Sequence, residues 1–244
     1  MQNIPTLEEM LKAGVHFGQK TSRWHPKMTP FIFGARGGIH IINLETTQDK
    51  LKEALEFIKG VAARGGVVLF VGSKKQARKI VKEQAEKCGM PYVTERWLGG
   101  TLTNFGQIKK SLKRLRMLKD QDAKGELKKY TKKEQLLLRR EIKDMDRKLG
   151  GIINMEKIPE AIFVVDIKTE KTAVAEAQVT KTKVVAVCDS NVNPDKISYI
   201  IPANDDSVKS IEMMCAAVAE AIEDGKKVPV INAAEPMNKK PQTK

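Results

Sequence analysis

Cysteine and long hydrophobic runs are scarce in this chain of 244 residues. Its three cysteines, Cys88, Cys188 and Cys215, lie far apart among apolar neighbours. This pattern excludes a disulfide framework and indicates reduced, buried thiols in a cytosolic compartment. No apolar run approaches the roughly 20 residues that cross a bilayer. The first ten residues also lack the basic and apolar regions of a secretory signal, so we expect no membrane span and no secretion.

The sequence also lacks the motifs of common cofactor and metal sites. Neither the G-x-x-x-x-G-K-[ST] loop nor the G-x-G-x-x-G fingerprint of nucleotide-binding proteins occurs. His16, His25 and His40 fall in no H-x₃-H spacing, and no C-x-x-C pair accompanies them. We therefore predict no metal site, no cofactor and no small-molecule substrate.

Positive charge is present in excess, and most of it lies in one segment. The net charge of the chain is +14. Residues 104–150 contain 16 Lys or Arg against 7 Asp or Glu, a net +9 that leaves +5 for the rest of the chain. Such an excess favours a polyanionic partner, either a nucleic acid or an anionic membrane surface.

Apolar runs and amphipathic segments alternate on both sides of this basic segment. The strands are expected at residues 39–44, 66–72, 161–165, 184–187 and 197–201. The helices are expected at residues 51–62 after an N-cap at Thr46, 73–88 from a Ser73/Gln76 capping box, 171–179, and 207–225 from an N-cap at Ser207. Because strand and helix alternate, the sequence predicts an α/β protein with a parallel sheet.

The basic segment has helical spacing of its own. Ile108, Leu112 and Leu115 form one apolar stripe, and a second contains Leu138, Ile142, Met145 and Leu149. Thr131 and Glu134 form a capping box, which predicts a helical hairpin with its tip at residues 120–130. We divide the chain into residues 1–103 and 151–225, the two parts of one α/β domain, residues 104–150, a basic hairpin insertion, and residues 226–244, a flexible basic tail.

Cations beside aromatic rings mark two further candidate RNA contacts, in residues 20–27 and 96–101. RNA sites stack such rings on exposed bases and bind phosphates with the cations. Lys74 and Lys75 follow a strand and open a helix, where free amides and ammonium groups suit a phosphodiester; an ordinary capped helix with solvated lysines is the alternative. The predicted RNA-binding residues are Arg23, Trp24, His25, Lys27, Lys74, Lys75, Arg96, Trp97, Lys109, Lys110, Lys113, Arg114 and Arg116.

Two aspartates supply an enzymatic alternative. Asp166 and Asp189 each end a predicted strand, where open α/β sheets bind ligands and Mg²⁺. A Mg²⁺-dependent enzyme acting on phosphoesters would use such a pair. However, strand-end aspartates also cap turns, and no third acid, nucleophile or base stands at a telling spacing, so we predict no catalytic residues.

Several segments resemble the bacterial-type family of the second protein of the small ribosomal subunit. They are, in order, TLEEMLKAGVHFG, GIHIINLETT, FVGSKKQA, RWLGGTLTNF, PEAIFVVD, AVAEA and IPANDD, and together they cover nearly the whole chain. The hairpin and the tail resemble the family in their basic, polar composition more than in their individual residues. The sequence departs from the family pattern at Gln19, His25 and Thr182-Lys183.

This resemblance implies a flavodoxin-like α/β fold with an inserted α-helical coiled-coil hairpin and no catalytic activity. It implies a structural constituent of the cytoplasmic ribosome that serves translation, and an organelle-encoded copy is compatible with it. The implied partners are small-subunit ribosomal RNA, bound between head and body, and other small-subunit proteins including the large first protein, which it helps to dock. No membrane partner is implied.

Overall fold

The computed structural model describes residues 4–227, and its centre is a five-stranded parallel sheet in the order β5-β4-β6-β7-β8. The strands are β4 (Val68–Val71), β5 (Tyr92–Val93), β6 (Ala161–Val165), β7 (Lys183–Cys188) and β8 (Tyr199–Pro202). All residues of β4 and β6 are buried, as expected for apolar strands covered on both faces. The predicted parallel sheet and the flavodoxin-like fold are therefore confirmed.

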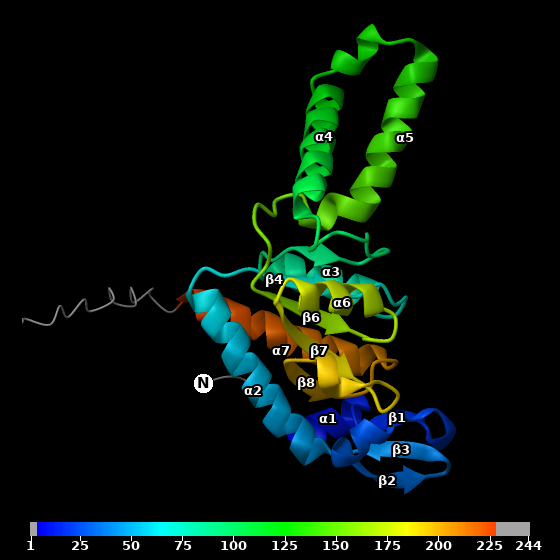
Figure 1. Ribbon diagram of the computed structural model, residues 1–244, viewed down its shortest axis with the longest axis vertical. Coiled ribbons are helices and arrows are strands. Elements are labelled where there is room, and N and C mark those ends of the chain that lie inside the picture. Colours follow the sequence, from blue (N-terminus) through cyan, green and yellow to red (C-terminus); the bar gives the residue numbers. More distant parts are fainter. Residues whose placement is uncertain (1–3, 228–244) are drawn as a thin grey trace, which may run out of the picture.

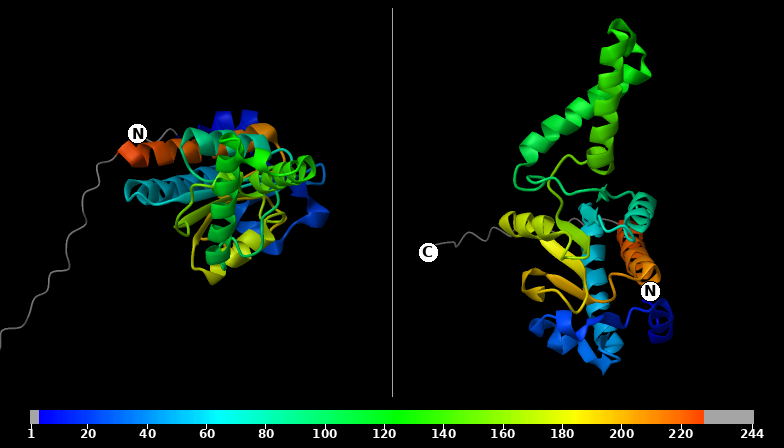
Figure 2. Two further views of the ribbon diagram at one scale, coloured as in Figure 1. Left: turned by 90° about the horizontal axis from the view of Figure 1, so that it is seen from above. Right: turned by 90° about the vertical axis from the view of Figure 1, so that its right-hand side faces the viewer.

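Helices cover both faces of this sheet (Figures 1 and 2). On one face lie α1 (Leu7–Ala13), α2 (Leu44–Ala63), α3 (Arg78–Lys87) and α7 (Val208–Lys227), packed on alternate strand residues such as Phe70 and Phe163. The other face, with Leu69 and Ile162, packs against α6 (Lys171–Val179) and the base of the basic hairpin. This alternation follows from the two-residue period of a strand.

A second, antiparallel sheet contradicts one expectation. Residues 39–44 were predicted as a strand of the main sheet, but β3 (Ile39–Ile42) pairs with β1 (Phe17–Lys20) and β2 (Ile32–Arg36). The short helices η1 (Thr21–Arg23) and η2 (Pro26–Phe31) connect β1 to β2. Thr46 is also not the N-cap of α2: Asn43 takes this place, and its Oδ1 accepts the backbone N–H groups of Glu45 and Thr46.

The basic segment forms an arm that projects from one end of the α/β domain (Figure 1). Its elements are α4 (Phe105–Ala123), η3 (Glu126–Lys129), α5 (Lys132–Leu149) and η4 (Gly150–Ile152). The predicted capping box is confirmed: the Thr131 hydroxyl accepts the N–H of Glu134, whose side chain returns to the N–H of Thr131. A coiled-coil packing of the two helices stays a prediction.

The arm does not close only on itself. Ile108, Leu112 and Leu115 are buried as predicted, but they share one apolar cluster with Leu69 and Val71 of the central sheet. The α5 stripe joins this cluster less completely, because Ile142 and Met145 are only half-buried. The base of the arm is therefore continuous with the core of the domain, which helical spacing alone does not reveal.

The C-terminal elements differ from the expectation in two details. Ser207 occupies the predicted N-cap position, since its carbonyl accepts the N–H of Ile211, but its hydroxyl donates to the carbonyl of Ala13 in α1 and so joins two helices. The helix α7 continues to Lys227, so the first two residues of the predicted tail are helical. The rest of that tail lies outside the described residues. No helix among residues 4–227 has the length and apolarity to cross a membrane.

Candidate nucleic-acid interface

The first predicted contact, residues 23–27, is held against the loop that follows β7. The N–H of His25 donates to the carbonyl of Ser190 across 2.8 Å, and its Nδ1 accepts the N–H of Lys27. The Lys27 ammonium forms an ion pair with Asp195. Trp24 is 39% exposed, with its ring centroid 5.1 Å from that of His40, and Arg23 is exposed. The fold thus presents a ring and a cation to solvent on an anchored loop.

The second predicted contact, at Arg96 and Trp97, is divided by the fold. The Arg96 side chain is exposed, whereas Trp97 is only 7% exposed. The indole Nε1 of Trp97 donates to Oε1 of Glu176, on α6, across 3.1 Å. Because its ring belongs to the apolar cluster below α6, Trp97 has no face free for a base in this conformation.

Glu176 organises the loop that leads into the arm, and the sequence reasoning missed it. Its carboxylate also accepts the backbone N–H groups of Gly100, Leu102 and Thr103, at 2.8 to 3.2 Å. Burial alone would raise the pKa of this carboxyl, but these bonds outweigh burial and lower it. The sequence offers one sign of this role: Glu176 is the single acid in the otherwise apolar segment AVAEA.

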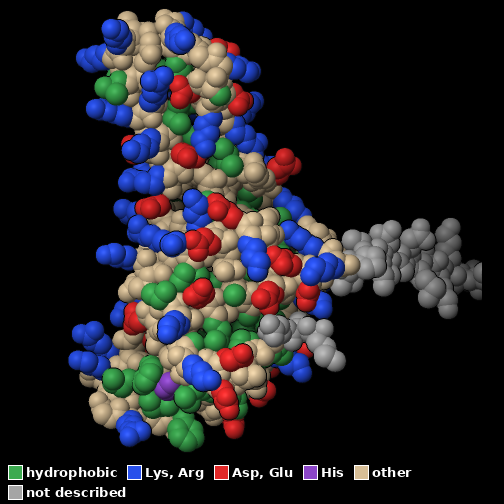
Figure 3. All heavy atoms as spheres, turned by 180° about the vertical axis from the view of Figure 1, so that it is seen from behind, with side chains coloured by type: hydrophobic (Ala, Val, Ile, Leu, Met, Phe, Trp, Pro, Cys, Tyr) green, Lys and Arg blue, Asp and Glu red, His purple; other side chains and the backbone are tan. Residues whose placement is uncertain are grey.

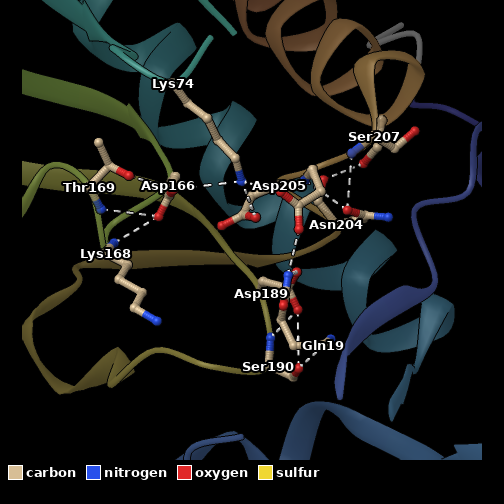
Figure 4. A network of polar contacts seen from close by, with 12 residues as sticks. Gln19, Lys74, Asp166, Lys168, Thr169, Asp189, Ser190, Asn204, Asp205 and Ser207 are labelled. Carbon is tan, nitrogen blue, oxygen red and sulfur yellow. Dashed lines mark hydrogen bonds and ion pairs between the residues drawn. The ribbon is translucent and has the colours of Figure 1, made fainter. Parts of the chain in front are cut away.

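Lys74 does not present its ammonium to a phosphate. The helix α3 begins at Arg78, so the predicted Ser73/Gln76 capping box is absent, and the N–H of Ser73 is donated to Glu170. The Lys74 Nζ lies 2.8 Å from Asp205 (Figure 4) and 2.7 Å from Asp206, and both aspartates follow β8. These carboxylates outweigh the effect of burial and raise the pKa of Lys74. Lys75, by contrast, is exposed.

The two strand-end aspartates of the enzymatic alternative are already bound by the protein (Figure 4). Asp166, at φ 67°, accepts the backbone N–H groups of Lys168 and Thr169 and the Thr169 hydroxyl, so it caps a turn. Asp189 is fully buried and accepts Nε2 of Gln19 across 3.1 Å. Both therefore serve the local structure, which is the non-catalytic interpretation of a strand-end aspartate.

An acidic cluster with two buried members and one exposed member lies beside Lys74. Asp189, Asp205 and Asp206 bring one carboxylate oxygen each within 4.8 Å of one another, an arrangement of oxygens that also suits a hard cation. Burial and the neighbouring carboxylates of Asp166 and Asp189 raise the pKa of Asp205 to about 7. The ammonium of Lys74 and the amide of Gln19 supply the donors to this cluster.

The five cations predicted on α4 fall into two groups. Lys110 and Lys113 are exposed and form no ion pair with any residue in the range 4–227. The other three have partners: Lys109 lies over the ring of Phe105, Arg114 pairs with Glu141 of α5 at 2.7 Å, and Arg116 donates to the carbonyl of Ile153, just after the arm. Lys and Arg side chains nevertheless follow the arm along the face shown in Figure 3.

The predicted residues do not converge on one site. The loop of residues 23–27 lies beside the small sheet at one end of the molecule, and the arm lies at the other end (Figure 1). The predicted residues therefore form separate groups on the surface and do not line one pocket.

The chain is a flavodoxin-like α/β domain that carries a projecting basic helical arm, and such a fold does not by itself fix a function. Residues 10–225 match the family described as ribosomal protein S2. Since this match covers most of the chain, the protein belongs to the ribosomal protein S2 family. It is a structural constituent of the small ribosomal subunit and serves translation.

Proposed function

We propose that the protein binds small-subunit ribosomal RNA through its arm and through the anchored loop of residues 23–27. The observation that supports this most strongly is the exposed charge of the arm, where Lys110 and Lys113 have no ion-pair partner among the described residues. Exposed cations of this kind bind the phosphates of RNA favourably, because each phosphate that a lysine neutralises releases a condensed counterion.

We further propose the finer roles that the family resemblance implies. The protein would lie between the head and body of the subunit in the cytoplasm and would help to dock the large first ribosomal protein. The division into residues 1–103 with 151–225, 104–150 and 226–244 is part of this proposal, with RNA and protein contacts shared between domain and arm. The side chains of the predicted set that are exposed are Arg23, Trp24, Lys27, Lys75, Arg96, Lys109, Lys110, Lys113, Arg114 and Arg116.

Sedimentation with ribosomal subunits tests this proposal. Small subunits depleted of the endogenous protein are mixed with the tagged chain and separated on a sucrose gradient at moderate salt. We expect the chain to move with the small subunit and to restore binding of the large first protein when that protein is added next. Migration at the top of the gradient would contradict the proposed function, and binding without this restoration would contradict only the docking role.

A further inference from the structure

A hollow of about 530 Å³ lies at the carboxyl ends of β6 and β7, apart from the predicted RNA contacts. Its volume falls in the range of roughly 300 to 1,000 Å³ that is typical of small-ligand sites. The buried side chains of Ile167, Val174 and Val192 form its floor. Its rim carries Lys168, Lys171 and Lys196, all of which are exposed.

The charge of this rim is uncompensated. None of the three lysines forms an ion pair with another residue of the described range. Figure 4 shows the Lys168 side chain pointing away from the Asp166 carboxylate, which accepts the backbone N–H of Lys168. No carboxylate lines the hollow, whereas four other hollows of the described surface each include at least one, such as Glu9, Glu95, Glu8 or Glu86. The hollow therefore favours an anion.

The floor indicates more than a bare anion. Three buried, branched apolar side chains line the hollow next to the lysines, and small-ligand sites commonly combine such an apolar lining with a few polar groups. Asn191 adds an amide to the lining, and its buried Oδ1 accepts no hydrogen bond from any described residue. An amide can pair with the edge of a base. Cations, an apolar floor and an unpaired amide together match a nucleotide.

The surroundings favour a nucleotide within RNA over a free one. The loop that carries Asn191 and Lys196 is bonded to residues 23–27, through Ser190 to His25 and through Asp195 to Lys27. The exposed ring of Trp24 and the cation of Arg23 therefore stand on a segment attached to the wall of the hollow. A strand that leaves the hollow would meet further groups for bases and phosphates. The glycine-rich loops that hold free nucleotides are absent from the sequence.

We propose that this hollow binds one unstacked nucleotide of a single-stranded RNA segment. The base lies on Ile167, Val174 and Val192, and the flanking phosphates meet Lys168, Lys171 and Lys196. This inference deepens the proposed function and rests on it. It adds a site within the α/β domain that is separate from the arm.

Two substitutions test the hollow in the full-length protein. Ala175→Trp fills it from an exposed position of α6, and Lys171→Glu reverses one rim charge. The matched controls are Val179→Trp, an exposed position later on the same helix that lies outside the lining, and Lys183→Glu, an exposed lysine at the opposite end of β7. Fluorescence anisotropy with a labelled 12-nucleotide RNA of mixed sequence gives the affinity, and a 4-thiouridine version gives crosslinked peptides. Calorimetry with adenosine monophosphate tests a free nucleotide.

We expect each hollow variant to bind the RNA about fivefold or more weakly than its control, and crosslinks to map to residues 168–175 or 191–196. Unchanged affinity in both hollow variants, or crosslinks confined to the arm, would overturn the inference. Tight binding of adenosine monophosphate that is lost in Ala175→Trp, with RNA binding intact, would assign the hollow to a free nucleotide instead. If the wild type sediments with small subunits while these tests fail, only this inference falls; if it neither sediments nor binds RNA, the proposed function falls as well.

Discussion

The indole N–H of Trp97 donates to the carboxylate of Glu176 across 3.1 Å, which joins the loop before the arm to helix α6. The two residues are 79 positions apart in the sequence. Because the same carboxylate also accepts three backbone N–H groups of residues 100–103, it replaces the hydrogen bonds that a strand or helix would provide. The direction in which the chain enters α4 therefore depends on one acid of the α/β domain.

Replacing Glu176 with Gln should destabilise the protein. In the wild type, N–H groups donate to both carboxylate oxygens of Glu176. Glutamine replaces one of these oxygens by an NH₂ group, which cannot accept a hydrogen bond, so at least one buried N–H loses its partner. We expect a loss of about 1 to 3 kcal/mol in the free energy of unfolding, measured in urea by tryptophan fluorescence. The control is Glu212→Gln, at an exposed position of α7. Equal stability of the two variants would show that this carboxylate does not hold the loop.

The same variant has a defined pH dependence. The pKa of Glu176 is lowered in the folded protein, so its contribution to stability is complete above the unfolded pKa of about 4.3 and is lost as the pH falls through the folded value. The stability difference between wild type and Glu176→Gln should therefore be constant near neutral pH and shrink in acid below that window. A constant difference down to the acid transition would contradict the lowered pKa.

Replacing Asp205 with Asn should flatten the pH profile of stability. In the folded state burial and the carboxylates of Asp166 and Asp189 raise the pKa of Asp205 to about 7, against about 3.9 when unfolded. Between these values the folded protein holds a proton that the unfolded chain has released, so its stability falls as the pH rises. Between pH 4 and pH 8, the free energy of unfolding of Asp205→Asn should rise relative to that of the wild type by on the order of 1 to 3 kcal/mol. Urea unfolding across that pH range measures this difference, with Asp49→Asn as an exposed control. Parallel pH profiles of stability for the wild type and Asp205→Asn would show that Asp205 does not titrate with a raised pKa.

The sequence predicts the sheet and the arm because both rest on local pattern. The buried runs of β4 and β6 and the capping box at Thr131 are complete within a few residues. The Trp97–Glu176 and Lys74–Asp205 contacts instead join residues 79 and 131 positions apart. Nothing local indicates such a contact, and for this reason Trp97 and Lys74 were predicted to face RNA.

The two arm lysines without partners should account for more RNA binding than the paired arginine. Lys110→Glu with Lys113→Glu removes two exposed cations, whereas Arg114→Glu first breaks an ion pair with Glu141. If each lysine contacts a phosphate, the slope of log affinity against log salt should fall by roughly one per contact, hence by about two in the double variant. Filter binding to small-subunit RNA at several salt concentrations gives the slopes. An unchanged slope in the double variant would indicate that this part of the arm faces a protein.

The length of the arm that can be removed follows from where its side chains pack. A short deletion of residues 118–145, closed with a Gly/Ser linker, keeps Ile108, Leu112 and Leu149 in the cluster that they share with the central sheet. We expect this variant to retain a cooperative thermal transition by circular dichroism. The long deletion of residues 108–149 removes all three of these buried side chains. Its free energy of unfolding should therefore fall by about 3 kcal/mol or more, or the variant should not fold.

RNA binding by the same two proteins separates charge from stability. The long deletion removes all 16 basic residues of the arm, whereas the short one removes nine of them and leaves Lys109, Lys110 and Lys113 on the folded base. Because these three cations stay beside the α/β domain, the short deletion should retain part of the RNA affinity and a reduced salt slope. Undiminished affinity after the short deletion would show that the outer arm meets something other than RNA. A cooperative transition in the long deletion, equal to that of wild type, would show that the arm is independent of the core after all.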